Sequence, residues 1–134
     1  GLAGGRELVT LADHAQALRA EALDVLVADV RRCGGLSGAR RLADVAQRHG
    51  VRMTLRSGPS PLAQAAAAHL AAAYWHVGPL QVEPMVSPLA ELLAPALDFS
   101  GGFMGVPDGP GLGCRVQEAI VAQYAMEAPD ERPA

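Results

Sequence analysis

The segment Asp24–Arg41, DVLVADVRRCGGLSGARR, constrains the fold of this chain more than any other stretch. Its apolar run ends at the carboxylate of Asp29. Two glycines that can form a turn follow, and the residues after them have helical periodicity. A continuous apolar run of this kind is typical of a parallel strand that is covered on both faces. The segment therefore predicts a strand–turn–helix unit in which Asp29 stands where the strand ends and a site can begin.

The rest of the chain alternates in the same way as far as Pro84. Thr10 and Asp13 predict a capping box for a first helix, and Ser60 and Pro61 are typical of a helix start. Strands are expected at Val25–Ala28, Val51–Leu55 and Leu80–Glu83, and helices at Leu11–Ala22, from a cap at Ser37 to His49, and Pro61–Ala73. Beyond Pro84 we expect a short helix at Leu89–Leu97, a strand at Phe103–Val106, a helix at Val116–Tyr124 and a tail over Met126–Ala134.

Strands and helices that alternate across short loops indicate an α/β fold with a parallel sheet. The units that can be read are too few to close a barrel, and they would leave an open strand edge. Because the chain begins at Gly1 rather than Met, and inside what looks like a strand, we expect a fragment of a longer protein.

Composition excludes several functions. The formal net charge is −3 and the basic residues are scattered, so nucleic acid is not an expected partner. No apolar run reaches the ~18 residues of a membrane span. No leader-like segment precedes the first element, and Cys33 and Cys114 are far apart, which favours a reduced, cytoplasmic setting. All 11 basic residues are Arg, so the chain holds no lysine base or Schiff-base lysine.

Five segments together resemble the late barrel strands of the enolase superfamily, in its mandelate racemase/muconate lactonizing enzyme family and the mandelate-racemase-type subgroup. They are LAGGRELVT (Leu2–Thr10), DVLVADVRRCGG (Asp24–Gly35), RMTLRSGPS (Arg52–Ser60), QVEP (Gln81–Pro84) and DFSGGFMGVPDGPGLGC (Asp98–Cys114). The resemblance implies the C-terminal half of a (β/α)-barrel, a TIM-like fold. Residues 1–97 would form the partial barrel, and residues 98–134 the C-terminal return segment and tail.

The resemblance also implies a chemistry. In that family a divalent metal, usually Mg²⁺, stabilises the charge that forms when a base removes the proton alpha to a carboxylate. A complete protein of this kind would be an acid-sugar dehydratase or racemase, hence a lyase or isomerase. Its substrate would be a small carboxylate or acid sugar. We expect it to form a homo-oligomer, or this chain to associate with a missing N-terminal half.

Four positions are candidates for the site by that resemblance. Asp29 matches the sixth-strand Asp, Glu83 matches the eighth-strand Glu, and Arg56 stands where a His base is usual. Arg cannot accept a proton, so we expect Arg56 to bind an anion. Arg6 stands where a metal-ligand Glu is usual, and the adjacent Glu7 is the candidate metal ligand if a bulge turns it inward.

Three alternatives remain open from the residues. An Asp29–Arg56 ion pair across adjacent strand ends is either part of a substrate site or an internal salt bridge. The chain is alternatively a non-catalytic, degenerate half-barrel that associates through its open edge. Finally, the Gly34–Gly38 turn, which follows Cys33, is close to a dinucleotide fingerprint, with Arg56 placed to meet the 2′-phosphate of NADP.

Overall fold

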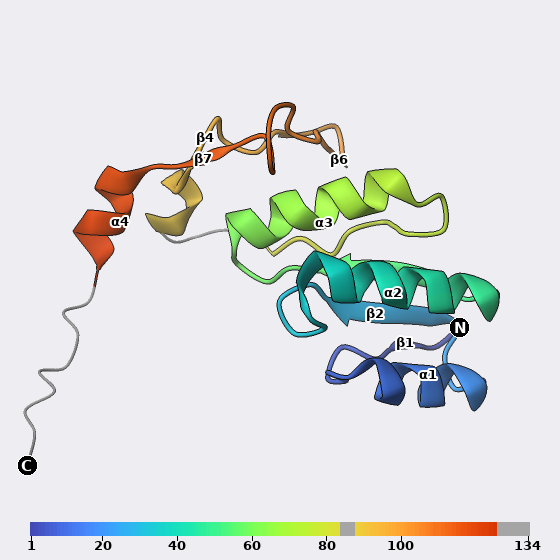
Figure 1. The fold of residues 1–134 in the computed structure, drawn as a ribbon. Helices are drawn as coiled ribbons and strands as arrows, with labels where there is room; N and C mark the ends of the chain where they lie inside the picture. Colours follow the sequence, from blue (N-terminus) through green and yellow to red (C-terminus); the bar gives the residue numbers. More distant parts are fainter. Residues whose placement is uncertain (84–87, 126–134) are drawn as a thin grey trace, which may run out of the picture.

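A parallel sheet with strand order β1–β2–β3 is the frame of the protein (Figure 1). The structure is a computed structural model, and it describes residues 1–83 and 88–125. Strand β1 spans Ala3–Gly4, β2 spans Val25–Asp29 and β3 spans Arg52–Arg56. Two isolated parallel bridges, Met53 to Val77 and Arg56 to Gln81, add a fourth extended segment beside β3.

Three helices, α1 (Leu11–Arg19), α2 (Gly35–Arg48) and α3 (Pro61–Ala73), follow the three strands and lie along one face of the sheet (Figure 1). Leu26 of β2 and Met53 and Leu55 of β3 are fully buried against these helices, where they meet Leu42. Because side chains alternate along a strand, every second residue faces the opposite side. The sheet therefore has a helix-covered face and a second face like the interior of a barrel.

The polar residues at the helix starts account for where α1 and α3 begin. Thr10 accepts from the backbone N–H of Asp13, and the Asp13 carboxylate accepts from Thr10 in return, so the predicted capping box is confirmed. Ser60 caps α3 and Pro61 occupies its first turn, as predicted. The prediction of Ser37 as a cap is wrong. Helix α2 starts earlier, after Gly34, which has φ +91 and makes no side-chain cap.

From Pro88 onward the chain forms short helices and two-residue strands. These are a 3₁₀ helix η1 (Pro88–Glu91), β4 (Leu93–Ala94), β5 (Phe99–Ser100), β6 (Phe103–Met104), β7 (Arg115–Val116) and α4 (Glu118–Tyr124). The strands pair in two small sheets, β4 with β7 and β5 with β6. The predicted helix Leu89–Leu97 is wrong, since Pro95 has no N–H to continue a helix beyond the first turn. The expected tail, Met126–Ala134, lies outside the described residues.

The expected architecture is confirmed: a parallel α/β arrangement consistent with part of a (β/α)-barrel. The expected strand Leu80–Glu83 is reduced to the single bridge at Gln81. Strand β4 pairs with β7 across residue 97, so the two parts expected at 1–97 and 98–134 are joined by strand pairing. Among the described residues, no helix is both long and apolar enough to cross a membrane. Cys33 is buried, Cys114 is half-buried, and both are free.

We expect Leu42→Ala to lower the free energy of unfolding by about 2–5 kcal/mol, because Leu42 is only 1% exposed and its removal leaves a cavity between α2 and the sheet. Chemical denaturation monitored by circular dichroism measures this. Leu36→Ala is the matched control, since Leu36 lies on the same helix but is 40% exposed, and it should cost about 0.5 kcal/mol or less. Equal losses in the two variants would contradict the placement of the core.

Candidate functional site

The C-terminal ends of β2 and β3 bring Asp29 and Arg56 side by side. The two strands pair in parallel over five residues, and Asp29 is the register partner of Arg56. By strand alternation both side chains lie on the face away from the helices, because Leu26 and Leu55 belong to the helix-packed core. The edge of the sheet therefore places a carboxylate and a guanidinium where a barrel-type site would lie.

Asp29 is held by a residue that the sequence did not single out, Arg31. The Nε of Arg31 donates to Oδ1 of Asp29 at 3.0 Å, and its Nη2 donates to Oδ2 at 2.7 Å. The backbone N–H of Arg31 donates to the same Oδ1 at 2.9 Å. The Asp29 side chain is only 4% exposed, whereas that of Arg31 is 44% exposed. Both oxygens of the buried carboxylate are thus occupied by one partly exposed guanidinium.

These contacts shift the pKa of Asp29. Burial is the largest influence and raises the pKa, but the side-chain and backbone hydrogen bonds from Arg31, its charge and the charge of Arg56 together hold the pKa below its usual value. The pKa of Arg31 is raised in turn, chiefly by the hydrogen bond to Asp29. The carboxylate is therefore ionised and acts as an acceptor that orients guanidinium groups.

Arg56 has a different partner from the one expected. Its Nη2 forms an ion pair with Oε1 of Glu83, the candidate residue at the end of the fourth extended segment. Among the described residues, the direct ion pairs made by the three candidates Asp29, Arg56 and Glu83 are Asp29 with Arg31 and Arg56 with Glu83. Arg56 acts on Asp29 through its charge. The strand ends thus bring the three predicted site residues together. Arg56 and Glu83 form one ion pair, and Asp29 lies beside Arg56 in a second ion pair with Arg31.

Gln64, in the first turn of α3, links the loop after β3 to the segment that carries Glu83. Its Nε2 lies 3.4 Å from the carbonyl oxygens of both Gly58 and Glu83. The side chain is 1% exposed, and its Oε1 has no partner among the described residues. Gln64 positions the backbone on which Glu83 stands. A lone Gln in an Ala-rich helix was the signal that the sequence offered.

Glu7, the candidate metal ligand, is turned toward guanidinium groups. Its carboxylate accepts from Nε of Arg6 at 2.7 Å and from Nη1 of Arg32 at 3.1 Å. Hydrogen bonding and the charge of Arg6 are the main causes that lower its pKa, and its side chain is 66% exposed. Within residues 1–83 and 88–125, no three His, Cys, Asp or Glu side chains gather to hold a metal ion. The described residues do not fit a divalent cation.

The glycines that resemble a dinucleotide loop have a local explanation. A Cβ on Gly38 would lie 1.7 Å from the carbonyl oxygen of Cys33, so the turn into α2 closes only over a glycine. Gly34, with φ +91, makes the turn itself. Tight packing of the turn on its own helix therefore accounts for the spacing that suggested a phosphate site.

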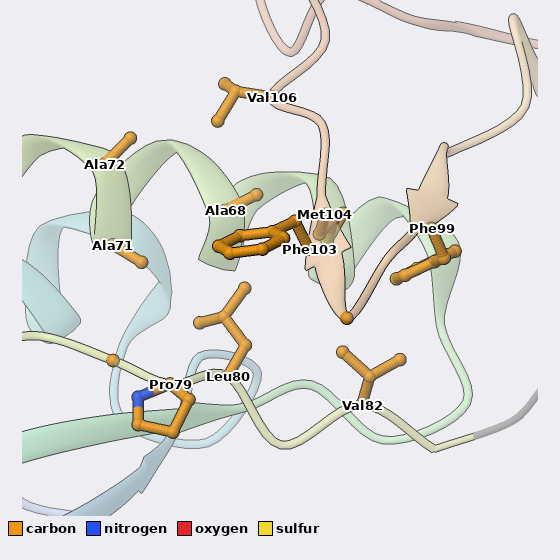
Figure 2. A pocket seen from close by; sticks show the side chains of 12 residues that line it. Ala68, Ala71, Ala72, Pro79, Leu80, Val82, Phe99, Phe103, Met104 and Val106 are labelled. Atoms are coloured by element: carbon orange, nitrogen blue, oxygen red, sulfur yellow. The ribbon is translucent and has the colours of Figure 1, made fainter.

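A cavity of about 610 Å³ lies between α3, the segment Gly78–Val82 and the β5–β6 hairpin (Figure 2). Phe103 extends from β6 toward Leu80 and Ala68, and every residue that lines the cavity is apolar or glycine. A smaller cavity of about 340 Å³ borders Gln64 and Glu83 and is otherwise apolar. The larger of these two cavities thus offers no charged group to a ligand, whereas Asp29, Arg56 and Glu83 stand at the strand ends.

Comparison with known proteins assigns this architecture. Residues 1–120 match the family model of enolase C-terminal domain-like proteins. The chain belongs to this family. A D-galactarolactone cycloisomerase of Agrobacterium fabrum is 32% identical over 125 residues, which cover 85% of this chain and 32% of that protein. A D-galactonate dehydratase of Ralstonia pickettii is 28% identical over 139 residues, covering 98% of this chain and 36% of that protein.

Solved structures agree with the fold. An enolase from Pantoea ananatis, solved with bound D-gluconate and Mg, superimposes with a TM-score of 0.83 at 26% identity and covers 95% of this chain and 31% of that chain. The chain therefore spans about a third of the length of the relatives it matches. The cycloisomerase acts on a sugar-acid lactone and the dehydratase on a sugar acid, as their names state.

We expect Arg31→Gln to raise the pKa of Asp29, because the raising influence of burial then meets less opposition. In the native protein the lowered pKa makes Asp29 contribute stability above its unfolded-state pKa, and this contribution is lost as the pH falls through the folded-state pKa. As the pH falls through that acidic range, the variant should lose less folding stability than the native protein does. Carboxyl ¹³C NMR titration measures the pKa, and urea unfolding at several pH values measures the stability.

Arg32→Gln is the control, since Arg32 is equally exposed but bonds Glu7 instead of Asp29. It should leave the Asp29 titration unchanged. An unchanged titration in Arg31→Gln would contradict the Asp29–Arg31 pair.

Proposed function

We propose that this chain forms the C-terminal part of the barrel in a mandelate-racemase-type protein, and that its strand ends bind the carboxylate of a small sugar acid. The family match and the sugar-acid relatives support the class of ligand. One observation supports the binding role above all: Arg56 ends β3, beside Asp29 and paired with Glu83. A guanidinium at this point can hold a carboxylate through charge-assisted hydrogen bonds.

Each candidate residue has a distinct role in this proposal. Asp29 orients the guanidinium groups at the strand ends, since it is buried and ionised. Arg56 binds the substrate carboxylate. Glu83 accepts from Arg56, and it becomes a hydrogen-bond donor to the substrate only when that ion pair opens and its carboxylate takes up a proton.

The proposed chemistry of this chain is binding rather than proton abstraction. Removal of the proton alpha to a carboxylate needs a base, and Arg56 stays protonated at working pH. The nearby carboxylates are each engaged by a guanidinium, Asp29 by Arg31 and Glu83 by Arg56. We therefore propose that the chain alone is inactive. The loss of the usual His and of the usual metal-ligand Glu together makes it a degenerate member of the family.

The partner that completes the barrel is a further part of the proposal. Both outer edges of the sheet, at β1 and at the Val77–Gln81 segment, lack a neighbouring strand among the described residues. Parallel edges of this kind pair with further strands. These belong to the remaining barrel of the same protein or to a second copy of the chain. A cytoplasmic location stays a prediction.

Mg²⁺, bound by the Pantoea ananatis relative, should bind weakly here because Arg6 occupies the position of a ligand. In the complete protein we expect Arg6→Glu to tighten Mg²⁺ binding by about tenfold or more, since a cation beside a dication is replaced by an anion. Isothermal titration with MgCl₂ measures the change. Arg19→Glu, in the last turn of α1, makes the same charge change as a control. Equal affinities for the two variants would show that position 6 does not face the metal site.

The variant Arg56→His distinguishes two hypotheses: that Arg56 binds the substrate carboxylate, or that position 56 has only lost a histidine base. In the complete protein we expect this variant to bind D-galactonate about tenfold or more weakly, because a charge-assisted bond is lost. It should not gain α-proton exchange, because Arg31 already occupies both oxygens of Asp29 that would orient a histidine. Binding is measured by calorimetry, and exchange by ¹H NMR in D₂O.

Arg52→His is the matched control, because Arg52 lies on the same strand and the same face as Arg56 but at the opposite end. Its binding of D-galactonate should be unchanged. Magnesium-dependent turnover that appears in Arg56→His would overturn the binding role and show that only the base was lost.

A further inference from the structure

Arg31 presents an unused hydrogen-bonding edge at the strand ends. Its Nε and Nη2 both donate to the Asp29 carboxylate, so one edge of the guanidinium is occupied. Among residues 1–83 and 88–125, Nη1 has no hydrogen-bond or ion-pair partner, and Nη2 has none besides Asp29. Asp29 thus orients the guanidinium, while its two terminal nitrogens keep donors without a partner among the described residues and the side chain is 44% exposed. Planar guanidinium ends of this kind match the two oxygens of a carboxylate.

The Arg31 guanidinium packs against Gly58, in the loop after β3. A Cβ at Gly58 would lie 2.5 Å from Nη2 and 2.7 Å from both Cζ and Nη1 of Arg31. Gly58 also has φ +55, which L side chains rarely adopt. The main chain of Gly58 is itself fixed by the Gln64 side chain from α3. The loop after β3 therefore supports the Arg31 guanidinium from one side, in space that any side chain at position 58 would need.

The charges at this edge favour an anion over a cation. Four guanidinium groups stand against three carboxylates, namely Arg6, Arg31, Arg32 and Arg56 against Glu7, Asp29 and Glu83. Arg31 and Arg56 lie on adjacent strand ends, because Asp29 and Arg56 are register partners. A ligand that extends across both strands would meet one guanidinium at each end.

We propose that Arg31 is a specificity-determining residue that binds a second carboxylate of the ligand through its Nη1–Nη2 end, so that the site prefers a sugar diacid to a sugar monoacid. This inference rests on the proposed function, which assigns the first carboxylate to Arg56. Asp29 and Gly58 are positioning residues, since the first orients the Arg31 guanidinium and the second leaves room for it.

The test uses three ligands of one configuration: the diacid D-galactarate, the monoacid D-galactonate and the neutral galactitol. Their dissociation constants for the complete protein are measured by calorimetry at fixed ionic strength. We expect D-galactarate to bind about tenfold or more tightly than D-galactonate, and D-galactonate to bind more tightly than galactitol. Arg31→Gln should lower the affinity for D-galactarate to that for D-galactonate, while the affinity for D-galactonate changes little.

Two further variants separate the fork geometry from charge alone. Arg31→Lys keeps the positive charge but loses the planar fork, so it should recover only part of the preference for the diacid. Arg32→Gln removes an equally exposed charge one residue along and should keep the preference in full. Thermal unfolding of each variant verifies that the protein is folded.

The outcomes distinguish the two proposals. If D-galactonate binds more tightly than galactitol but the diacid is not preferred, or is preferred equally in Arg31→Gln, the role of Arg31 is overturned and the proposed function stands. If Arg32→Gln abolishes the preference for the diacid as Arg31→Gln does, the preference depends on the overall positive charge of the edge rather than on Arg31, and the inference fails. If neither acid binds more tightly than galactitol, both proposals are overturned.

Discussion

The parallel pairing of β2 with β3 is the interaction on which the rest of the structure depends. Five consecutive register pairs fix which residues meet at the strand ends, and a slip by one residue would turn Asp29 toward the helices. Leu26 and Leu55 prevent that slip, because each is fully buried in the helix-packed core only in the observed register. The charged edge is therefore set by hydrophobic burial on the opposite face of the sheet.

Much of this fold is legible in the sequence because its signals are local. The apolar run before Asp29 and the caps at Thr10 and Ser60 each act within a few residues, and the structure places strands and helices accordingly. The helix expected at Leu89–Leu97 does not form: the chain has a 3₁₀ helix at Pro88–Glu91 and strand β4 at Leu93–Ala94. Its replacement, a strand paired with β7, depends on contacts between distant residues that periodicity does not encode.

The sequence predicted the positions of the candidate site, but the ion pair that it suggested, Asp29 with Arg56, is replaced by Asp29 with Arg31 and Arg56 with Glu83. Asp29, Arg56 and Glu83 do meet, since parallel strands end at one edge. Their ion-pair partners depend on side-chain reach: Arg31 stands two residues beyond Asp29 and folds back over Gly58, where no Cβ blocks it. The Asp-x-Arg spacing after an apolar run was the available signal. The bidentate contact of Arg31 with Asp29 also needs a glycine at position 58, and the Asp-x-Arg spacing alone does not predict that.

The substitutions at positions 6 and 56 act in the same electrostatic direction. Each places a guanidinium where the family resemblance expects a metal ligand or a base, and each is partly neutralised by an adjacent carboxylate, Glu7 or Glu83. Burying an unpaired charge is costly, and Arg56, whose side chain is 21% exposed, has Glu83 as its ion-pair partner. The partners also explain why the edge is not simply repulsive to cations. In our proposal, the preference of this edge for anions comes from the Arg31 donors that have no partner among the described residues, and this proposal makes hydrogen-bond geometry more important than net charge in selecting the ligand.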